Sequence, residues 1–66
     1  MYNFFVEESA RTGESFQITG ADYNHIRNVL RMHPGDVFLV SCSGQSHLCR
    51  LESFGEDTVM AAIQEE

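Results

Sequence analysis

The sequence predicts a mostly β fold, a small β-barrel of about five strands with one short α-helix at about residues 20–32. Three observations support this prediction. Short aromatic and β-branched segments alternate in polarity and are separated by turns that contain glycine. One segment instead repeats its apolar residues at three- and four-residue spacing. The chain has 66 residues, which is enough for a single small domain.

Five segments have the composition of strands, and we expect mostly antiparallel pairing between them. They are residues 2–6, 15–18, 36–42, 46–54 and 58–64. Arg11–Gly13 is expected to form a turn. The order of the strands in the sheet does not follow from the sequence.

The helical segment, residues 20–32, has a start signal and a stop signal. Thr19 is placed to cap it through its hydroxyl, and Asp22 puts a carboxylate near the positive helix end. Pro34–Gly35 stops it, because proline cannot continue a helix. The apolar stripe that should plug the barrel consists of Tyr23, Ile26, Val29 and Leu30.

The charge of the chain is unevenly distributed. The formal net charge is −6, and the only basic residues besides histidine are four arginines. Taken alone, this balance argues against binding to nucleic acid. Between Tyr23 and Leu51, however, three arginines and three histidines face a single acid, Asp36. The middle of the chain is therefore locally basic, and local charge is what a ligand meets.

The candidate binding residues lie on the predicted helix. Arg27 and Arg31 are four residues apart, so an α-helix would present them on one face, which Asn24 and Asn28 extend. One interpretation is a solvated helix surface, and the other is a face that contacts phosphate through planar guanidinium groups. His25 flanks the apolar stripe, either as a half-buried side chain bonded to backbone or as a further binding residue.

No catalytic residue, cofactor-binding residue or metal ligand is predicted. Cys42, His47 and Cys49 lack a fourth ligand and the short Cys-x2–4-Cys spacing of structural zinc sites. The two thiols are expected to be small buried apolar groups. No apolar run approaches the roughly 18 residues of a membrane helix, and the N-terminus lacks the layout of a signal peptide, so we expect a soluble, cytoplasmic protein without a membrane partner.

The segment His25–Asp36 reads H-x-x-x-V-L-R-x-x-x-G-D. It resembles a signature of the N-terminal domain in the bacterial ribosomal RNA small subunit methyltransferase E family, whose members form N3-methyluridine in 16S rRNA. The opening Phe4-Phe5-Val6 resembles the first strand of that family. The resemblance extends over essentially the whole chain.

This resemblance implies that residues 1–66 are a PUA-like RNA-binding domain, the N-terminal part of a longer protein. The parent would be a methyltransferase that uses S-adenosyl-L-methionine, with its cofactor and catalytic residues in a C-terminal SPOUT domain absent from this chain. The segment alone would not be catalytic and would hold no cofactor. The implied partners are 16S rRNA or the small ribosomal subunit, the SPOUT domain, and a second copy in a homodimer.

Position by position, His25, Arg31 and Gly35 match the family signature, and Arg27 matches it only weakly. The candidate RNA-binding residues are therefore Arg27, Arg31 and His25. The chain departs from the family at Asn3, where a basic residue is frequent, and in its acidic balance. Two alternatives stay open: a structural domain that packs on the catalytic domain or a dimer mate, and a free-standing protein that binds a small ligand or metal.

Overall fold

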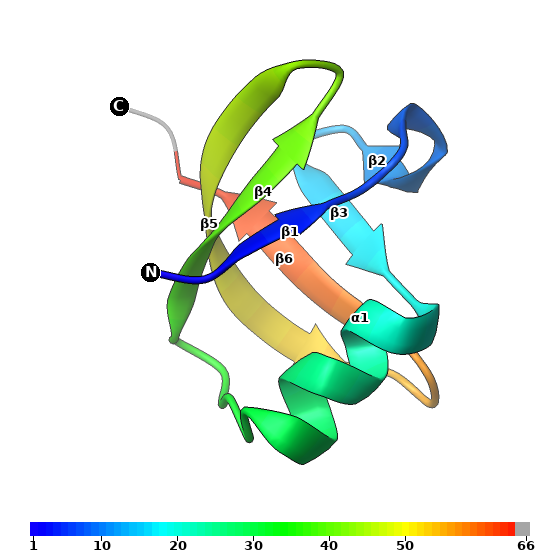
Figure 1. Ribbon diagram of the computed structural model, residues 1–66, viewed down its shortest axis with the longest axis vertical. Helices are drawn as coiled ribbons and strands as arrows, with labels where there is room; N and C mark the ends of the chain where they lie inside the picture. The colour runs from blue at the N-terminus through cyan, green and yellow to red at the C-terminus, as the bar shows by residue number, and fades with distance from the viewer. Residues whose placement is uncertain (65–66) are drawn as a thin grey trace.

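The computed structural model describes residues 1–64 and shows a strongly curved six-stranded sheet with a short helical segment at one end (Figure 1). The strands are β1 (Asn3–Phe5), β2 (Arg11–Thr12), β3 (Ser15–Ile18), β4 (Val37–Cys42), β5 (Gln45–Phe54) and β6 (Val59–Ile63). The helical elements are η1 (Glu8–Ala10), α1 (Gly20–Asn24) and η2 (His25–Val29). The predicted fold class, mostly β with one short helical segment, is confirmed.

The strand order is β1-β4-β5-β6-β3-β2. The first pair is parallel and the other four pairs are antiparallel. Because β1 and β2 are the two edges, backbone hydrogen bonds do not close the sheet into the expected barrel. The sheet has six strands instead of about five, since Arg11–Thr12, expected as a turn, pairs with Ser15 and Phe16. Gly13 makes the tight connection with a φ of 63°.

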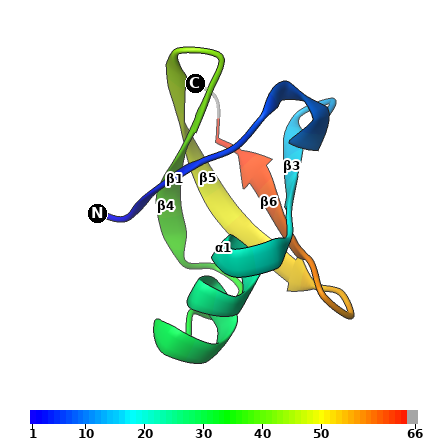
Figure 2. The same ribbon diagram turned by 45° about the vertical axis from the view of Figure 1, so that its right-hand side comes forward.

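The long strand β5 gives the sheet its curvature, which Figure 2 shows from a second direction. Its first half pairs with β4 and its second half with β6. The register with β6 shifts between Leu51 and Ser53, which is a β-bulge. A bulge bends its strand and increases the local twist. The two halves of β5 can therefore lie in differently oriented parts of one sheet.

The β4–β5 hairpin turns through Ser43 and Gly44, whose φ angles are 53° and 80°. Two central residues with positive φ are the requirement of a type I′ turn, whose twist matches that of the flanking strands. The resulting register places Cys42 opposite Gln45 and Cys49 opposite Phe38. The two cysteines are therefore not cross-strand neighbours, and both are free and buried, as expected. Burial raises the pKa of the Cys49 thiol to about 11.

The core lies inside the curve of the sheet and is formed by alternating residues of the strands. Phe4 and Phe38 meet edge to face with their ring centroids 5.4 Å apart. Such aromatic pairs add about 0.5–1.5 kcal/mol beyond the burial of their area. The buried residues are Phe4, Phe16, Ile18, Ile26, Phe38, Val40, Cys42, Cys49, Leu51, Val59, Ala61 and Ile63.

The helical segment differs from the predicted helix in length and geometry. It begins after Thr19 as expected, but the Thr19 side chain makes no capping hydrogen bond. From His25 it continues as a π-helix, in which the Leu30 N–H donates to the His25 carbonyl at 2.8 Å, five residues back. It ends at Val29, not at residue 32. No helix within residues 1–64 is long and apolar enough to cross a membrane.

The wider turn changes which side chains face the core. Ile26 is fully buried, and Leu30 packs against the core as expected. Val29, which an α-helical stripe would bury, is 61% exposed. The prediction for Val29 is wrong because the wider π-helical turn brings Leu30, and not Val29, to the side of the segment where Ile26 is buried.

Candidate nucleic-acid interface

Arg31 reverses the chain at the end of the helical segment. Its φ is 55°, in the left-handed region that favours glycine. The Met32 N–H then donates to the Ile26 carbonyl at 3.0 Å, which satisfies one of the free carbonyls of the helix end. A left-handed conformation costs an L-residue roughly 1–2 kcal/mol. Arg31 therefore occupies a strained cap with its side chain exposed.

A tight turn over His33–Asp36 connects this cap to β4. The Asp36 N–H donates to the His33 carbonyl at 3.0 Å, and Gly35 has a φ of 102°. Proline followed by glycine with positive φ is the pattern of a type II turn. The Asp36 carboxylate accepts a hydrogen bond from the His33 N–H at 2.8 Å. The only acid of this part of the chain is thus engaged with the backbone of its own turn.

Arg27 rests on an aromatic side chain from the far end of β5. Its guanidinium carbon lies 4.8 Å from the centroid of the Phe54 ring. Phe54 in turn meets Tyr23 edge to face, with centroids 6.5 Å apart. The Tyr23 hydroxyl donates to the Glu56 carbonyl at 3.2 Å and ties the helical segment to the β5–β6 turn. Stacking on one ring leaves the other face of the exposed guanidinium free for a ligand.

The sequence predicts Arg27 and Arg31 on one face of an α-helix. The structure does not support that arrangement. The helical segment is π-helical from His25 and has ended before Arg31. What the two residues share is position, because both are exposed side chains at the C-terminal end of the segment. Asn24 and Asn28 do share a face, since the Asn28 amide donates to Asn24 Oδ1 at 2.8 Å.

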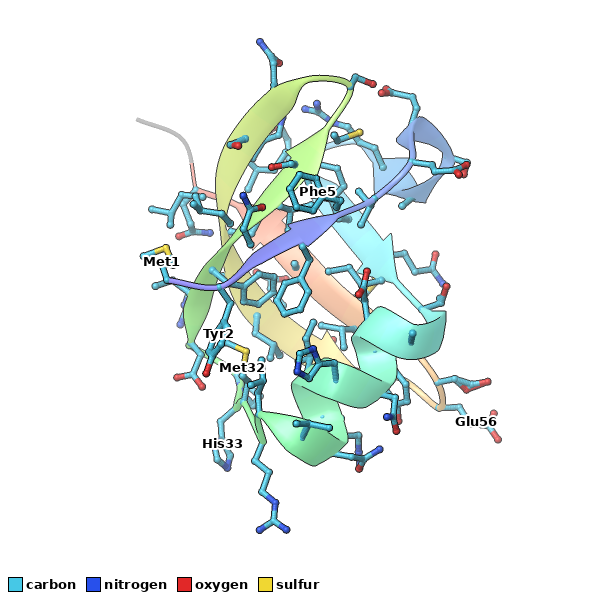
Figure 3. The ribbon with its side chains drawn as sticks, in the orientation of Figure 1. Met1, Tyr2, Phe5, Met32, His33 and Glu56 are labelled. Carbon is cyan, nitrogen blue, oxygen red and sulfur yellow. The ribbon has the colours of Figure 1, made fainter. Side chains whose placement is uncertain are left out.

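His25 is exposed and is not the half-buried residue that the sequence suggested. Its ring meets the Phe4 ring edge to face, with centroids 6.2 Å apart. Figure 3 shows the end of the helical segment with Met32 and His33, and Glu56 on the other side of that segment. Among the described residues 1–64, no group of three or more His, Cys, Asp and Glu side chains could hold a metal ion.

Sequence reasoning missed Phe54 as the partner of Arg27. The two residues are 27 positions apart, and only the bend of β5 brings the ring under the guanidinium. An aromatic residue at a strand end was visible in the sequence. The contact between this residue and Arg27 was not visible, because the order of the strands does not follow from the sequence.

Known proteins resemble this chain in sequence and fold. Residues 18–63 match the family described as the RNA methyltransferase PUA domain. Ribosomal RNA small subunit methyltransferase E of Bacillus subtilis (strain 168) is 34% identical over 70 residues, covering 98% of this chain and 27% of that protein.

Two solved structures are similar over nearly the whole chain. One, described as a hypothetical protein, has a TM-score of 0.84 at 31% identity and covers 97% of this chain and 28% of its own. The other is ribosomal RNA small subunit methyltransferase E from Neisseria gonorrhoeae bound to S-adenosyl methionine, with a TM-score of 0.73 at 25% identity over 96% of this chain and 27% of its own. The present chain thus spans about a quarter of the length of these relatives. It belongs to the RNA methyltransferase PUA domain family.

Proposed function

We propose that this chain is the RNA-contacting domain of a methyltransferase that uses S-adenosyl-L-methionine to form N3-methyluridine in 16S rRNA. In this proposal Arg31 and Arg27 contact backbone phosphates, and His25 borders the same surface. The domain docks the small ribosomal subunit or its RNA for a C-terminal SPOUT domain, in a cytoplasmic enzyme that forms a homodimer. The relatives' names support the class of enzyme, and their greater length supports the presence of a further domain.

The proposal rests on how the structure holds the two arginines, Arg27 through its side chain and Arg31 through its backbone. Arg27 is held on the Phe54 ring, so less side-chain freedom is lost when it binds a ligand. The backbone of Arg31 has a left-handed conformation in which glycine would be less strained, yet the residue carries a long cationic side chain. Strain of this kind concentrates at functional positions.

The remaining charge limits the affinity of such a surface. Most acids lie outside the basic middle of the sequence, with Glu7, Glu8 and Glu14 near its start and Glu52, Glu56 and Asp57 near its end. With two or three phosphate contacts, binding to RNA is expected to be weak and to depend strongly on salt. Phosphate contacts fix position and carry no sequence information, so this surface docks RNA without reading its sequence.

Alanine substitution with a matched control tests the proposal. Arg27→Ala and Arg31→Ala should each weaken binding to a 16S rRNA fragment about fivefold at 0.1 M salt, the usual contribution of one phosphate contact. Arg50→Ala removes the same charge from an exposed position on β5 and should change the affinity much less. Equal effects of all three substitutions, or none, would contradict the proposal.

A second candidate function is a structural domain that packs on the rest of its own protein or on a dimer mate. The favouring observation is that Val37 and Leu48, on the outer face of the sheet, are 43% and 41% exposed. Met32, which the sequence suggested for such a patch, instead packs partly buried against the core. This candidate expects the arginine variants to bind RNA as the wild type does.

A further inference from the structure

A hollow of about 380 Å³ lies away from the arginines, where β1 meets the β4–β5 hairpin. This volume falls within the range of small-molecule sites. A smaller hollow of about 220 Å³ lies between β1 and β3, with the carboxylates of Glu7 and Asp22 at its border. The larger hollow is lined by an aromatic ring and by uncharged polar side chains, chiefly Asn3, Phe5, Ser41, Ser43 and Ser46.

The register of the strands builds this hollow on the outer face of the sheet. Phe5 is the partner of Ser41 on β4, and Ser41 is the partner of Ser46 on β5. Side chains of paired residues point to the same face and are close neighbours. One row across three strands thus consists of a phenyl ring followed by two hydroxyl groups.

Hydrogen bonds within the hollow orient its polar atoms. The Ser41 hydroxyl donates to Asn3 Oδ1 at 3.0 Å, and the oxygens of Ser41 and Ser46 are 2.9 Å apart. This arrangement turns the Asn3 amino group away from Ser41, so both of its N–H donors remain for a ligand. Because the single Ser41 hydrogen is used in the bond to Asn3, the Ser46 hydroxyl donates to Ser41 and keeps its lone pairs to accept a hydrogen bond from a ligand.

The alternation of side chains along β1 directs Phe5 outward, so an apolar ring lies at an exposed position. Its side chain is 74% exposed, whereas the neighbouring Phe4 is buried in the core. Figure 3 shows the Phe5 ring on β1 toward the hairpin, away from the end where Met32 and His33 lie. A flat apolar face beside hydrogen-bonding groups matches a flat ring whose edge carries donors and acceptors.

The acid at the edge of the hollow, Glu8, favours a neutral base over a charged phosphate as the ligand. The Glu8 carboxylate accepts hydrogen bonds from the Ser43 hydroxyl at 2.5 Å and from the Cys42 thiol at 3.4 Å. Its negative charge disfavours a phosphate at this end of the hollow. A neutral ligand part does not meet that repulsion.

We propose that this hollow binds one unpaired nucleobase, stacked on Phe5 with its edge hydrogen-bonded to Asn3 and Ser46. The proposal rests on the proposed RNA-contacting function and deepens it, since the arginines would hold the backbone while this hollow holds a base. Single-stranded RNA is generally recognised by stacking on aromatic side chains together with hydrogen bonds to base edges. The occupied RNA would therefore be an unpaired stretch rather than a continuous duplex.

Free nucleosides test the hollow without any phosphate contact. Uridine and adenosine, titrated at millimolar concentration, should shift the NMR signals of the Asn3 side-chain amide and of the Ser41–Ser46 backbone amides. Phe5→Ala should abolish these shifts. The substitution leaves the core intact because the ring is mostly exposed. Val37→Ala, at another exposed apolar position, should keep them.

Oligonucleotides test the same hollow in RNA. Phe5→Ala should weaken binding of a short single-stranded RNA by about fivefold or more, the usual effect of losing one stacked base. It should leave binding of a duplex of the same sequence unchanged. Asn3→Asp, which replaces two donors by acceptors, should also weaken single-strand binding.

The outcomes separate this proposal from the function on which it rests. If the arginine variants weaken RNA binding but Phe5→Ala does not, and nucleosides shift no pocket signal, the base site is refuted and the arginine surface stands. If nucleosides shift the pocket signals but the arginine variants bind RNA normally, the base site stands and the phosphate surface fails. A change of oligomeric state in Phe5→Ala without nucleoside shifts would identify an interface between copies and overturn the base site.

Discussion

Arg31 is the residue where sequence resemblance and backbone geometry coincide. It matches the arginine of the family signature and has a φ of 55° at the end of the helical segment. Most helices that end in a left-handed residue use glycine there, because glycine has no Cβ to clash. Arginine at this position is therefore expected to make the fold less stable than glycine would. What arginine adds is its cationic side chain, which glycine lacks.

Substitution of this residue by glycine tests whether stability and binding are separate. Arg31→Gly should raise the free energy of unfolding by about 0.5–1 kcal/mol, because relief of the left-handed strain exceeds the entropic cost of glycine. The same variant should bind RNA as weakly as Arg31→Ala. Urea denaturation and an RNA titration of both variants check this, and a destabilised Arg31→Gly would show that the side chain serves the fold.

Glu8 connects η1 to the β4–β5 turn and gives the chain a defined response to acid. Hydrogen bonding from the Ser43 hydroxyl, helped by the Cys42 thiol, lowers the pKa of this carboxyl below its ordinary value of 4.5. A carboxyl with a lowered folded-state pKa stabilises the fold above its unfolded pKa, and that stabilisation is lost as the pH falls through the folded value.

Glu8→Gln should therefore reduce the loss of stability between about pH 5 and the folded-state pKa of this carboxyl. Urea midpoints at pH 7 and under progressively more acidic conditions measure the effect. Glu7→Gln removes the same charge from the neighbouring exposed side chain and serves as the control. Identical acid profiles for wild type and Glu8→Gln would mean that the Ser43 contact does not persist in solution.

At the scale of elements, the π-helical turn decides which side of the helical segment is apolar. Leu30 packs against the core while Val29 is exposed, the reverse of what an α-helical stripe requires at position 29. Leu30→Ala should therefore cost about 1–3 kcal/mol, below the range for a fully buried leucine. Val29→Ala should stay within about 0.5 kcal/mol of wild type.

Chemical denaturation of the two variants distinguishes the helix types. A loss for Val29→Ala as large as that for Leu30→Ala would indicate the regular α-helix, whose apolar stripe buries both residues. The comparison is internally controlled, because both substitutions trim an aliphatic residue to alanine at adjacent positions of one segment.

Local alternation predicts most elements of this chain, and non-local pairing accounts for the rest. The strands β3, β4, β5 and β6 lie within one or two residues of their expected bounds, since period-two alternation and glycine turns are local signals. The two-residue strand β2 was missed because it has no alternation of its own and exists through its partner β3. The parallel pairing of β1 with β4 is likewise set by tertiary packing.

The candidate site is less predictable than the fold. Composition identified a basic middle of the chain, and spacing selected Arg27 and Arg31. Neither composition nor spacing predicts that Arg27 stacks on Phe54, because this contact depends on the bend of β5. They also do not predict the left-handed backbone conformation of Arg31, because it depends on how the π-helical turn ends.

At the scale of the whole molecule, stability is expected to be small. A 66-residue domain typically has a free energy of unfolding of roughly 3–10 kcal/mol. Phe38 is fully buried at the centre of the core and stacks edge to face on Phe4. Phe38→Ala should cost about 3–5 kcal/mol, a large part of that free energy, and should strongly lower the unfolding temperature.

Circular dichroism with thermal unfolding measures this effect. A cooperative transition near that of the wild type would show that the core tolerates a large cavity. Phe5→Ala is the matched control, because it removes the same side chain from an exposed position and should unfold at nearly the wild-type temperature.

The charge of the whole molecule frames the central claim, which is that an acidic domain contacts RNA through a small cationic surface. The most direct measurement is the salt dependence of binding to a single-stranded 16S rRNA fragment, for the wild type and for the double variant Arg27→Ala/Arg31→Ala. The slope of the logarithm of affinity against the logarithm of salt concentration should be shallower in the double variant by about 1–1.5, the loss of two phosphate contacts. Parallel slopes for the two proteins would contradict the account.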